Sequence, residues 1–179
     1  MNHADHVNLL RDGVRGTEGV WADLGSGGGA FTLALADLLG PKSEIYSIDK
    51  DQRALKEQER AMQARFPQAT VHYRLADFNE PLALPALDGL VIANALHYQQ
   101  PAAREPLVQR LKGYLRPGAR LIVVEYNVDR GNVWVPYPLS YRTWAALARQ
   151  VGFTQTRLLA TVPSRFLREI YSALSRCDE

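Results

Sequence analysis

The sequence has little cysteine, no long hydrophobic run and no strong excess of one charge. Cys177 is the only cysteine among 179 residues, which excludes an internal disulfide, and we expect a reducing cytoplasm. No apolar run approaches the roughly 20 residues that cross a bilayer. The first residues lack a basic start followed by an apolar core, so we expect no secretory signal. The formal net charge of +2 gives no reason to expect nucleic acid or an anionic membrane as a partner.

The remaining composition is that of an ordinary globular domain. Hydrophobic residues make up 46% of the chain and charged residues 22%. The length suits a single domain over residues 1–179 with a sizeable core. We find no internal repeat, low-complexity tract or interdomain linker.

A glycine-rich turn follows the apolar run Val20–Leu24. Glycines stand at the alternate positions Gly25, Gly27 and Gly29, and a helical pattern begins just after them. A backbone without Cβ atoms lets a ligand lie against such a turn, and the start of the helix directs free N–H groups at the same place. The turn predicts a nucleotide-type binding loop. The alternative is a flexible loop with no ligand.

Short apolar runs alternate with helical stripes through residue 152. This alternation predicts a parallel, doubly wound sheet with helices on both faces. We expect Pro117–Gly118 to break a helix that includes Tyr114 and Leu115. The predicted strands of this part are Val20–Leu24, Ile45–Ile48, Val71–Leu75, Leu90–Ala93 and Leu121–Val124.

The end of the chain departs from this alternation. We expect a helix with Ser140 as its N-cap and Gly152 as its stop, followed by strands at Thr154–Val162 and Arg165–Ala173. Two closing strands with no helix between them predict an antiparallel final strand. The second segment also fits a helical stripe, so a helix there stays open.

Polar residues stand at or just after the end of each predicted parallel strand. The carboxyl ends of the strands in an open parallel sheet form a ligand crevice, so we expect these side chains to gather there. The carboxylate of Asp49 can accept hydrogen bonds from both hydroxyls of a ribose. Its alternative role is the N-cap of a helix beginning near Asp51. The five residues are Asp23, Asp49, Asp77, Asn94 and Glu125.

These features resemble the class I S-adenosylmethionine-dependent methyltransferases. Asp23 and the three alternating glycines are similar to the first motif of that family. The stretch Leu115–Leu121 resembles its L-x-P-G-G turn, with Ala119 in place of the second glycine. The resemblance covers residues 6–162. It implies a Rossmann-like, mostly parallel seven-stranded sheet flanked by helices, with the last strand antiparallel.

The resemblance also implies S-adenosylmethionine as cofactor and S-adenosylhomocysteine as product. A sulfonium is already a good leaving group, so we expect no metal. By this similarity Asp23 approaches the ammonium group, Asp77 accepts from the adenine amino group, Phe78 forms an apolar wall, and Asn94 and Ala95 lie along the methionine part. Lys50 follows Asp49, and its alternative is a solvated lysine. The implied cofactor-binding residues are Asp23, Leu24, Gly25, Ser26, Gly27, Gly29, Asp49, Lys50, Asp77, Phe78, Asn94 and Ala95.

His97 is the predicted general base, should the acceptor need to lose a proton. Its alternative role is a packed histidine at a helix start. We expect a small, flat or apolar acceptor beneath a cap loop of residues 127–139, although Trp134 and Tyr137 could instead only pack the sheet edge. The resemblance suggests that residues 1–19 form a lid, and the alternative is a mobile terminus. We expect the protein to be a monomer or a homodimer. The predicted substrate-binding residues are His6, Tyr98, Glu125, Tyr126, Trp134 and Tyr137.

Two other functions remain open from the sequence. Gly25, Gly27 and Ala30 also fit the dinucleotide fingerprint G-x-G-x-x-G/A, which would make the protein an NAD-type oxidoreductase. Asp23 speaks against that function because a carboxylate repels a pyrophosphate. The other alternative is a cofactor-binding subunit or regulator with no activity of its own.

Overall fold

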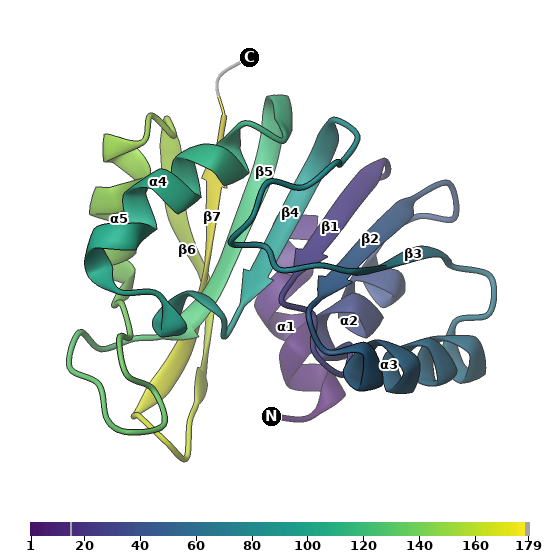
Figure 1. Ribbon diagram of the computed structural model, residues 1–179, viewed down its shortest axis with the longest axis horizontal. Coiled ribbons are helices and arrows are strands. Elements are labelled where there is room, and N and C mark those ends of the chain that lie inside the picture. Colours follow the sequence, from purple (N-terminus) through teal and green to yellow (C-terminus); the bar gives the residue numbers. More distant parts are fainter. Residues whose placement is uncertain (15, 178–179) are drawn as a thin grey trace.

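A seven-stranded sheet in the order β3-β2-β1-β4-β5-β7-β6 forms the centre of the computed structural model, which describes residues 1–14 and 16–177 (Figure 1). Strands β1 to β5 pair in parallel, and β7 is antiparallel to both β5 and β6. The predicted doubly wound fold with an antiparallel last strand is therefore confirmed. The strands are β1 (Val20–Leu24), β2 (Glu44–Asp49), β3 (Thr70–Leu75), β4 (Leu87–Ala93), β5 (Leu115–Tyr126), β6 (Gln155–Pro163) and β7 (Glu169–Arg176).

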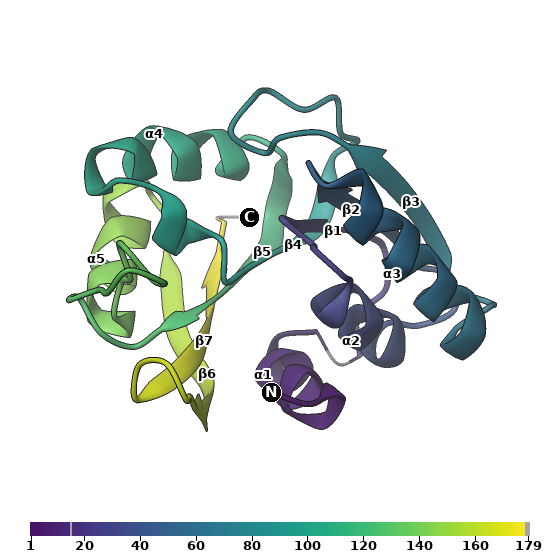
Figure 2. The ribbon, with the colours of Figure 1, turned by 60° about the horizontal axis from the view of Figure 1, so that its bottom comes forward.

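Helices cover both faces of the sheet. Figure 2 shows α1 and α4 on opposite sides of it. Buried residues of α1 and α2 form one hydrophobic layer, and those of α4 and α5 form the other. The helices are α1 (His3–Val14), α2 (Ala30–Leu38), α3 (Gln52–Arg65), the 3₁₀ helix η1 (Leu96–Tyr98), α4 (Pro101–Lys112) and α5 (Tyr141–Gln150).

The central segments Leu90–Ala93 of β4 and Leu121–Val124 of β5 are buried on both faces of the sheet, which explains why they are wholly apolar. Leu90 and Ile92 pack in the layer of α4 and α5, whereas Val91 and Ala93 pack in the layer of α1 and α2. Successive side chains of a strand point to opposite faces, so a strand covered on both sides needs apolar residues at every position. None of the helices in the described residues is long and apolar enough to cross a membrane.

Helix α1 belongs to the cover of the sheet. Leu9, Leu10 and Val14 are fully buried, and a Cβ at Gly13 would lie 2.7 Å from Cδ1 of Ile122. The helix also contacts α2 and β6. This packing holds α1 against the sheet. The lid role of residues 1–19 stays a prediction.

The predicted boundaries were correct at some helix ends and wrong at others. Ser140 caps α5 by accepting from the Thr143 N–H, and Gly152 follows the helix with φ +85°. Pro117–Gly118 does not end α4, which stops at Lys112 before Gly113. Tyr114 follows the helix end, while Leu115, Pro117 and Gly118 lie in β5, where Leu115 pairs with Leu87 and the register then shifts.

The final strand begins later than predicted, at Glu169. Residues 164–168 form the turn of the β6–β7 hairpin, in which the Ser164 N–H donates to the Arg168 carbonyl at 2.9 Å. Arg168, the last residue before β7, has φ 46°, a turn conformation that is incompatible with a continuous strand from Arg165. The helical alternative for this segment was wrong.

Candidate functional site

The glycine-rich turn joins β1 to α2 at the edge where the parallel strands end. Gly25, Gly27 and Gly29 have φ values of 71°, 52° and 86°, a region that favours glycine. The N–H groups of Gly25 and Ser26 both donate to the Ile48 carbonyl, at 2.9 and 3.1 Å. These bonds tie the turn to the end of β2. A Cβ at Gly27 would meet nothing within 4 Å, so this part of the turn is open to a ligand.

A buried hydrogen-bond network supports the turn from behind. Ser47 Oγ donates to Ser26 Oγ at 2.7 Å, Ser26 Oγ donates to Gln58 Oε1 at 3.2 Å, and Gln58 Nε2 donates to Ser47 Oγ at 2.7 Å. All three side chains are buried, so their polar atoms depend on one another. Sequence reasoning missed Ser47 and Gln58. Gln58 did leave a signal, because it interrupts the apolar stripe of Leu55 and Met62 on α3.

We expect Gly29→Ala to destabilise the protein by about 2–4 kcal/mol, measured by urea unfolding. A Cβ there would lie 2.3 Å from Gln58 Cγ, and the φ of 86° adds backbone strain. Gly28→Ala is the matched control, since a Cβ at Gly28 meets nothing within 4 Å and its φ is not positive. Equal stability of the two variants would contradict the packing role of Gly29.

Asp49 connects the turn to the cleft. Its Oδ2 accepts from the Gly27 N–H at 2.7 Å, and its Oδ1 accepts from the Asp51 N–H at 2.8 Å. The N-cap of α3 is Asp51, which accepts from the N–H groups of Arg53 and Ala54. The N-cap alternative for Asp49 was therefore wrong. Each oxygen of the Asp49 carboxylate retains a lone pair for a further donor.

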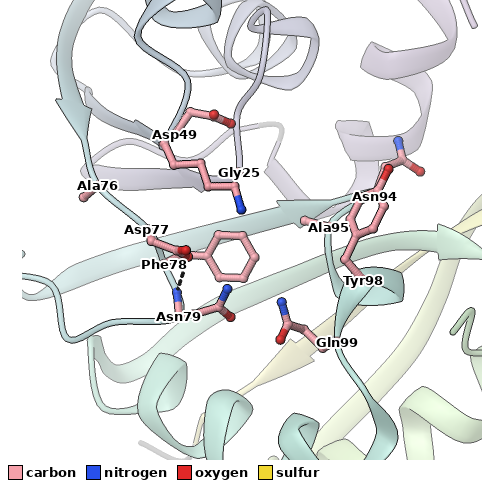
Figure 3. A pocket seen from close by; sticks show the side chains of 11 residues that line it. Gly25, Asp49, Ala76, Asp77, Phe78, Asn79, Asn94, Ala95, Tyr98 and Gln99 are labelled. Atoms are coloured by element: carbon pink, nitrogen blue, oxygen red, sulfur yellow. Dashed lines mark hydrogen bonds between the residues drawn. The ribbon is translucent and has the colours of Figure 1, made fainter. Parts of the chain in front are cut away.

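A cleft of about 190 Å³ opens between the turn and the ends of β2, β3 and β4 (Figure 3). The ring of Phe78 projects into it, and a Cβ at Gly25 would lie 3.1 Å from that ring. Asp77 Oδ1 accepts from the Asn79 N–H at 2.9 Å, which leaves its Oδ2 for another donor. The lining residues are Gly25, Asp49, Lys50, Ala76, Asp77, Phe78, Asn79, Asn94, Ala95, Tyr98 and Gln99.

Asp23 lies beneath the turn and does not line the cleft. The carboxylate is 1% exposed, and its Oδ2 accepts from Thr32 Oγ1 at 2.7 Å. Burial raises the pKa of Asp23 to about 7, with a further increase from the charge of Asp49, while the Thr32 hydrogen bond opposes the shift. A cation bound near the turn would favour the ionised form of this carboxylate.

Asp23→Asn should stabilise the protein relative to the unmodified chain as pH rises. The folded-state pKa of Asp23 is raised, so the folded protein binds this proton more firmly than the unfolded chain. The contribution of Asp23 to stability is most favourable at low pH and declines as pH rises from about 4 through 7. The difference in unfolding free energy between variant and parent should grow by on the order of 2 kcal/mol from pH 5 to pH 8. Urea unfolding at both pH values measures it, and a difference independent of pH would contradict the assignment.

His97 lies behind the cleft in a buried pair with Glu125. His97 Nδ1 and Glu125 Oε2 are 2.9 Å apart, and the His97 backbone N–H donates to Glu125 Oε1 at 3.1 Å. Within the described residues the His97 Nε2 atom has no hydrogen-bond partner. The ring lies beside Tyr98, at a centroid distance of 4.3 Å, and beside Tyr126, at 5.5 Å. A carboxylate on Nδ1 holds the imidazole in one orientation and leaves Nε2 as the acceptor.

The loop of residues 127–139 is held in place by hydrogen bonds to α4, to η1 and to the start of α5. The buried Arg104 of α4 donates to the carbonyls of Tyr137 and Pro138, and the Tyr137 N–H donates to the His97 carbonyl at 3.0 Å. Asp129 accepts from the Ser140 N–H and the Thr143 hydroxyl. Sequence reasoning missed Arg104, which no local pattern distinguishes from an exposed helical arginine.

The remaining predicted residues lie in different surroundings. Leu24 is buried in the core, and Ser26 supports the turn. His6 is half-buried against the Phe31 ring, and burial lowers its pKa. Trp134 is 74% exposed and Tyr137 is 39% exposed, and neither lines the cleft. Of the five strand-end residues, the structure brings Asp49, Asp77 and Asn94 together in the cleft, whereas Asp23 and Glu125 lie buried behind it.

Residues 22–118 match the family model described as "Methyltransferase domain". The chain belongs to this family of methyltransferase domains. The resemblance seen in the sequence is confirmed, and the matched segment contains the turn, the cleft residues and His97.

Comparisons with individual proteins agree with this assignment. A curated relative from Thermoplasma volcanium, "Probable cobalt-precorrin-6B C(15)-methyltransferase (decarboxylating)", is 26% identical over 126 residues. That match covers 70% of this methyltransferase domain and 60% of the relative, so the chain spans less than two thirds of the relative's length.

Solved structures share the fold. A 1,6-didemethyltoxoflavin-N1-methyltransferase of Burkholderia thailandensis superposes with a TM-score of 0.75 at 17% identity, covering 99% of this chain and 78% of the other. Human N-acetylserotonin methyltransferase superposes with a TM-score of 0.72 at 18% identity, covering 100% of this chain and 52% of the other.

Proposed function

We propose that this domain binds S-adenosylmethionine in the cleft and transfers its methyl group to a small-molecule acceptor. The observation that carries the proposal is the convergence of Asp49, Asp77 and Asn94 on one cleft beside the open part of the glycine turn. This cleft lies beside the point where the strand order reverses between β1 and β4, the usual ligand site of such sheets. Two similar proteins support a small-molecule acceptor, since the cobalt-precorrin-6B methyltransferase and the 1,6-didemethyltoxoflavin methyltransferase are both named for small-molecule acceptors.

The residues present fit this cofactor. Asp49 has free lone pairs for the two ribose hydroxyls, and Asp77 Oδ2 has one for the adenine amino group. Phe78, Ala95 and Gly25 offer an apolar surface for the base, and Gly27 leaves space beside the turn. The Asp49 carboxylate gives this site negative charge, and a bound cation would favour the ionised form of Asp23, whose pKa burial raises to about 7. Both effects suit an ammonium group and disfavour the pyrophosphate of a dinucleotide.

When bound, S-adenosylmethionine supplies a methyl group to an acceptor lone pair, and the breaking of the methyl carbon–sulfur bond converts the sulfonium into the neutral thioether S-adenosylhomocysteine. The protein's part is to align the reactants, worth about 7–11 kcal/mol in favourable cases. If the acceptor atom carries a proton, His97 Nε2 would take it while Glu125 holds Nδ1. Residues Tyr98 and Tyr126 flank this imidazole and would contact the acceptor.

The experiment that tests this function measures S-adenosylhomocysteine formation with a panel of phenols, carboxylic acids and amines. We expect formation that depends on both the protein and an acceptor. Cofactor binding without transfer to any acceptor, restored by a partner protein, would instead favour a non-catalytic subunit. Localisation in the cytoplasm, the monomeric or dimeric state and the absence of a nucleic-acid partner stay predictions.

A further inference from the structure

A second and larger cavity lies beside the cofactor cleft. Its volume is about 640 Å³, within the range of about 300–1,000 Å³ for small-molecule sites. It lies between the start of α1, the end of β5 and the β6–β7 hairpin, which gather at the end of the sheet where the parallel strands finish (Figure 1). Its lining includes Asp5, Asn94, Tyr126, Ser164, Arg165 and Phe166.

The two cavities meet at Asn94, which lines both of them. Asn94 has φ 51°, and its Oδ1 is buried without a hydrogen-bond partner in the described part of the chain. An unpartnered buried amide oxygen is costly unless a ligand or a water donates to it. The buried His97 lines neither cavity, but its ring contacts Tyr98 of the cofactor cleft and lies 5.5 Å from the ring of Tyr126, which lines the second cavity.

The hairpin gives the second cavity an aromatic wall and a free positive charge. Ser164 Oγ accepts from the Phe166 N–H at 3.2 Å within the turn that carries Phe166. The Phe166 side chain is 63% exposed, although burial of a phenyl ring lowers the free energy of the protein. Arg165 makes no hydrogen bond or ion pair with any described residue. The carboxylate of Asp5, which also lines the cavity, accepts a hydrogen bond from the Asn2 N–H at 2.9 Å. Of the two charged side chains, Arg165 is therefore the one that lacks a hydrogen-bond partner among the described residues.

We propose that this second cavity is the acceptor site, and that the acceptor is a planar, mainly apolar molecule bearing a carboxylate. The plane would contact Tyr126 and Phe166, the carboxylate would pair with Arg165, and the accepting atom would lie at Asn94 beside the cofactor cleft. A guanidinium and a carboxylate form strong, directional hydrogen bonds. This inference rests on the proposed function. It places the acceptor against the β6–β7 hairpin and not against Trp134 of the loop 127–139.

The test uses two matched probes, 6-hydroxy-2-naphthoate and its neutral amide, 6-hydroxy-2-naphthamide. Each is titrated into protein with and without saturating S-adenosylhomocysteine, which occupies the cofactor cleft without a methyl to transfer. We expect the naphthoate to bind at least about 5-fold more tightly than the amide. Arg165→Gln should remove this difference, and Phe166→Ala should weaken both probes about 5-fold.

Trp134→Ala is the matched control, because Trp134 is an exposed aromatic residue outside the cavity. It should change neither probe. Equal affinity for the two probes, no binding of either, or a loss with Trp134→Ala but not Arg165→Gln would overturn the proposal. Titration of S-adenosylhomocysteine itself should be unaltered in all three variants. Failure of that ligand to bind the unmodified protein would count against the proposed function, whatever the probes do.

Discussion

Replacing Asp49 with alanine should weaken the binding of S-adenosylmethionine by at least about 100-fold. The carboxylate lines the cleft and is oriented by the N–H groups of Gly27 and Asp51. Two charge-assisted hydrogen bonds to ribose hydroxyls would each contribute about 1.5–3 kcal/mol, and about 2.7 kcal/mol corresponds to 100-fold in affinity. Isothermal titration of the variant and the parent measures the change.

Asp51→Ala is the matched control for this result. Asp51 is exposed two residues further along and caps α3 through the N–H groups of Arg53 and Ala54. Its loss should cost about 1 kcal/mol of stability and leave cofactor affinity within a few-fold of the parent. Similar losses of affinity in the two variants would show that Asp49 acts by ordering the loop. An unchanged affinity in Asp49→Ala would contradict its role at the ribose.

Replacing His97 with alanine should lower turnover by about 10²–10⁴-fold for an acceptor that must lose a proton. Cofactor affinity should stay unchanged, because His97 lies behind the cleft and does not line it. Glu125→Gln should also lower turnover, since the pair at 2.9 Å orients the imidazole. The measurement is the rate of S-adenosylhomocysteine formation at saturating cofactor, alongside the cofactor dissociation constant.

His72→Ala is the corresponding control. His72 also pairs with a glutamate, Glu44, at 2.9 Å, but on the exposed edge of the sheet at β3. Its loss should leave turnover unaltered. If His97→Ala destabilises the protein while turnover stays within a few-fold, the buried pair is structural. The alternative of a packed histidine would then hold.

The sequence allowed the fold and part of the site to be predicted because both rest on local patterns. The apolar runs mark strands, and the residues that end parallel strands must meet at one edge of the sheet. This geometry is why Asp49, Asp77 and Asn94 were predicted together and lie together. The alternation of glycines likewise predicted a tight turn before a helix, and in the structure Gly25, Gly27 and Gly29 all have positive φ.

Other features depend on contacts between distant segments. Gln58 and Arg104 are buried because α3 packs behind the turn and α4 packs behind the loop 127–139. The position of Gln58 in the apolar stripe of α3 indicates burial but not its partners, and no local spacing reveals the burial of Arg104. Pro117–Gly118 resembled a helix stop, yet pairing of Leu115 with Leu87 draws this segment into β5. The second cavity was also missed, because it needs the hairpin turn that begins at Ser164.

The measurement that tests the central claim most directly is isothermal titration of the unmodified protein with S-adenosylmethionine, S-adenosylhomocysteine and NAD. We expect both sulfur compounds to bind at one site per chain and NAD not to bind. Preferential binding of NAD, or no binding of either sulfur compound, would contradict it.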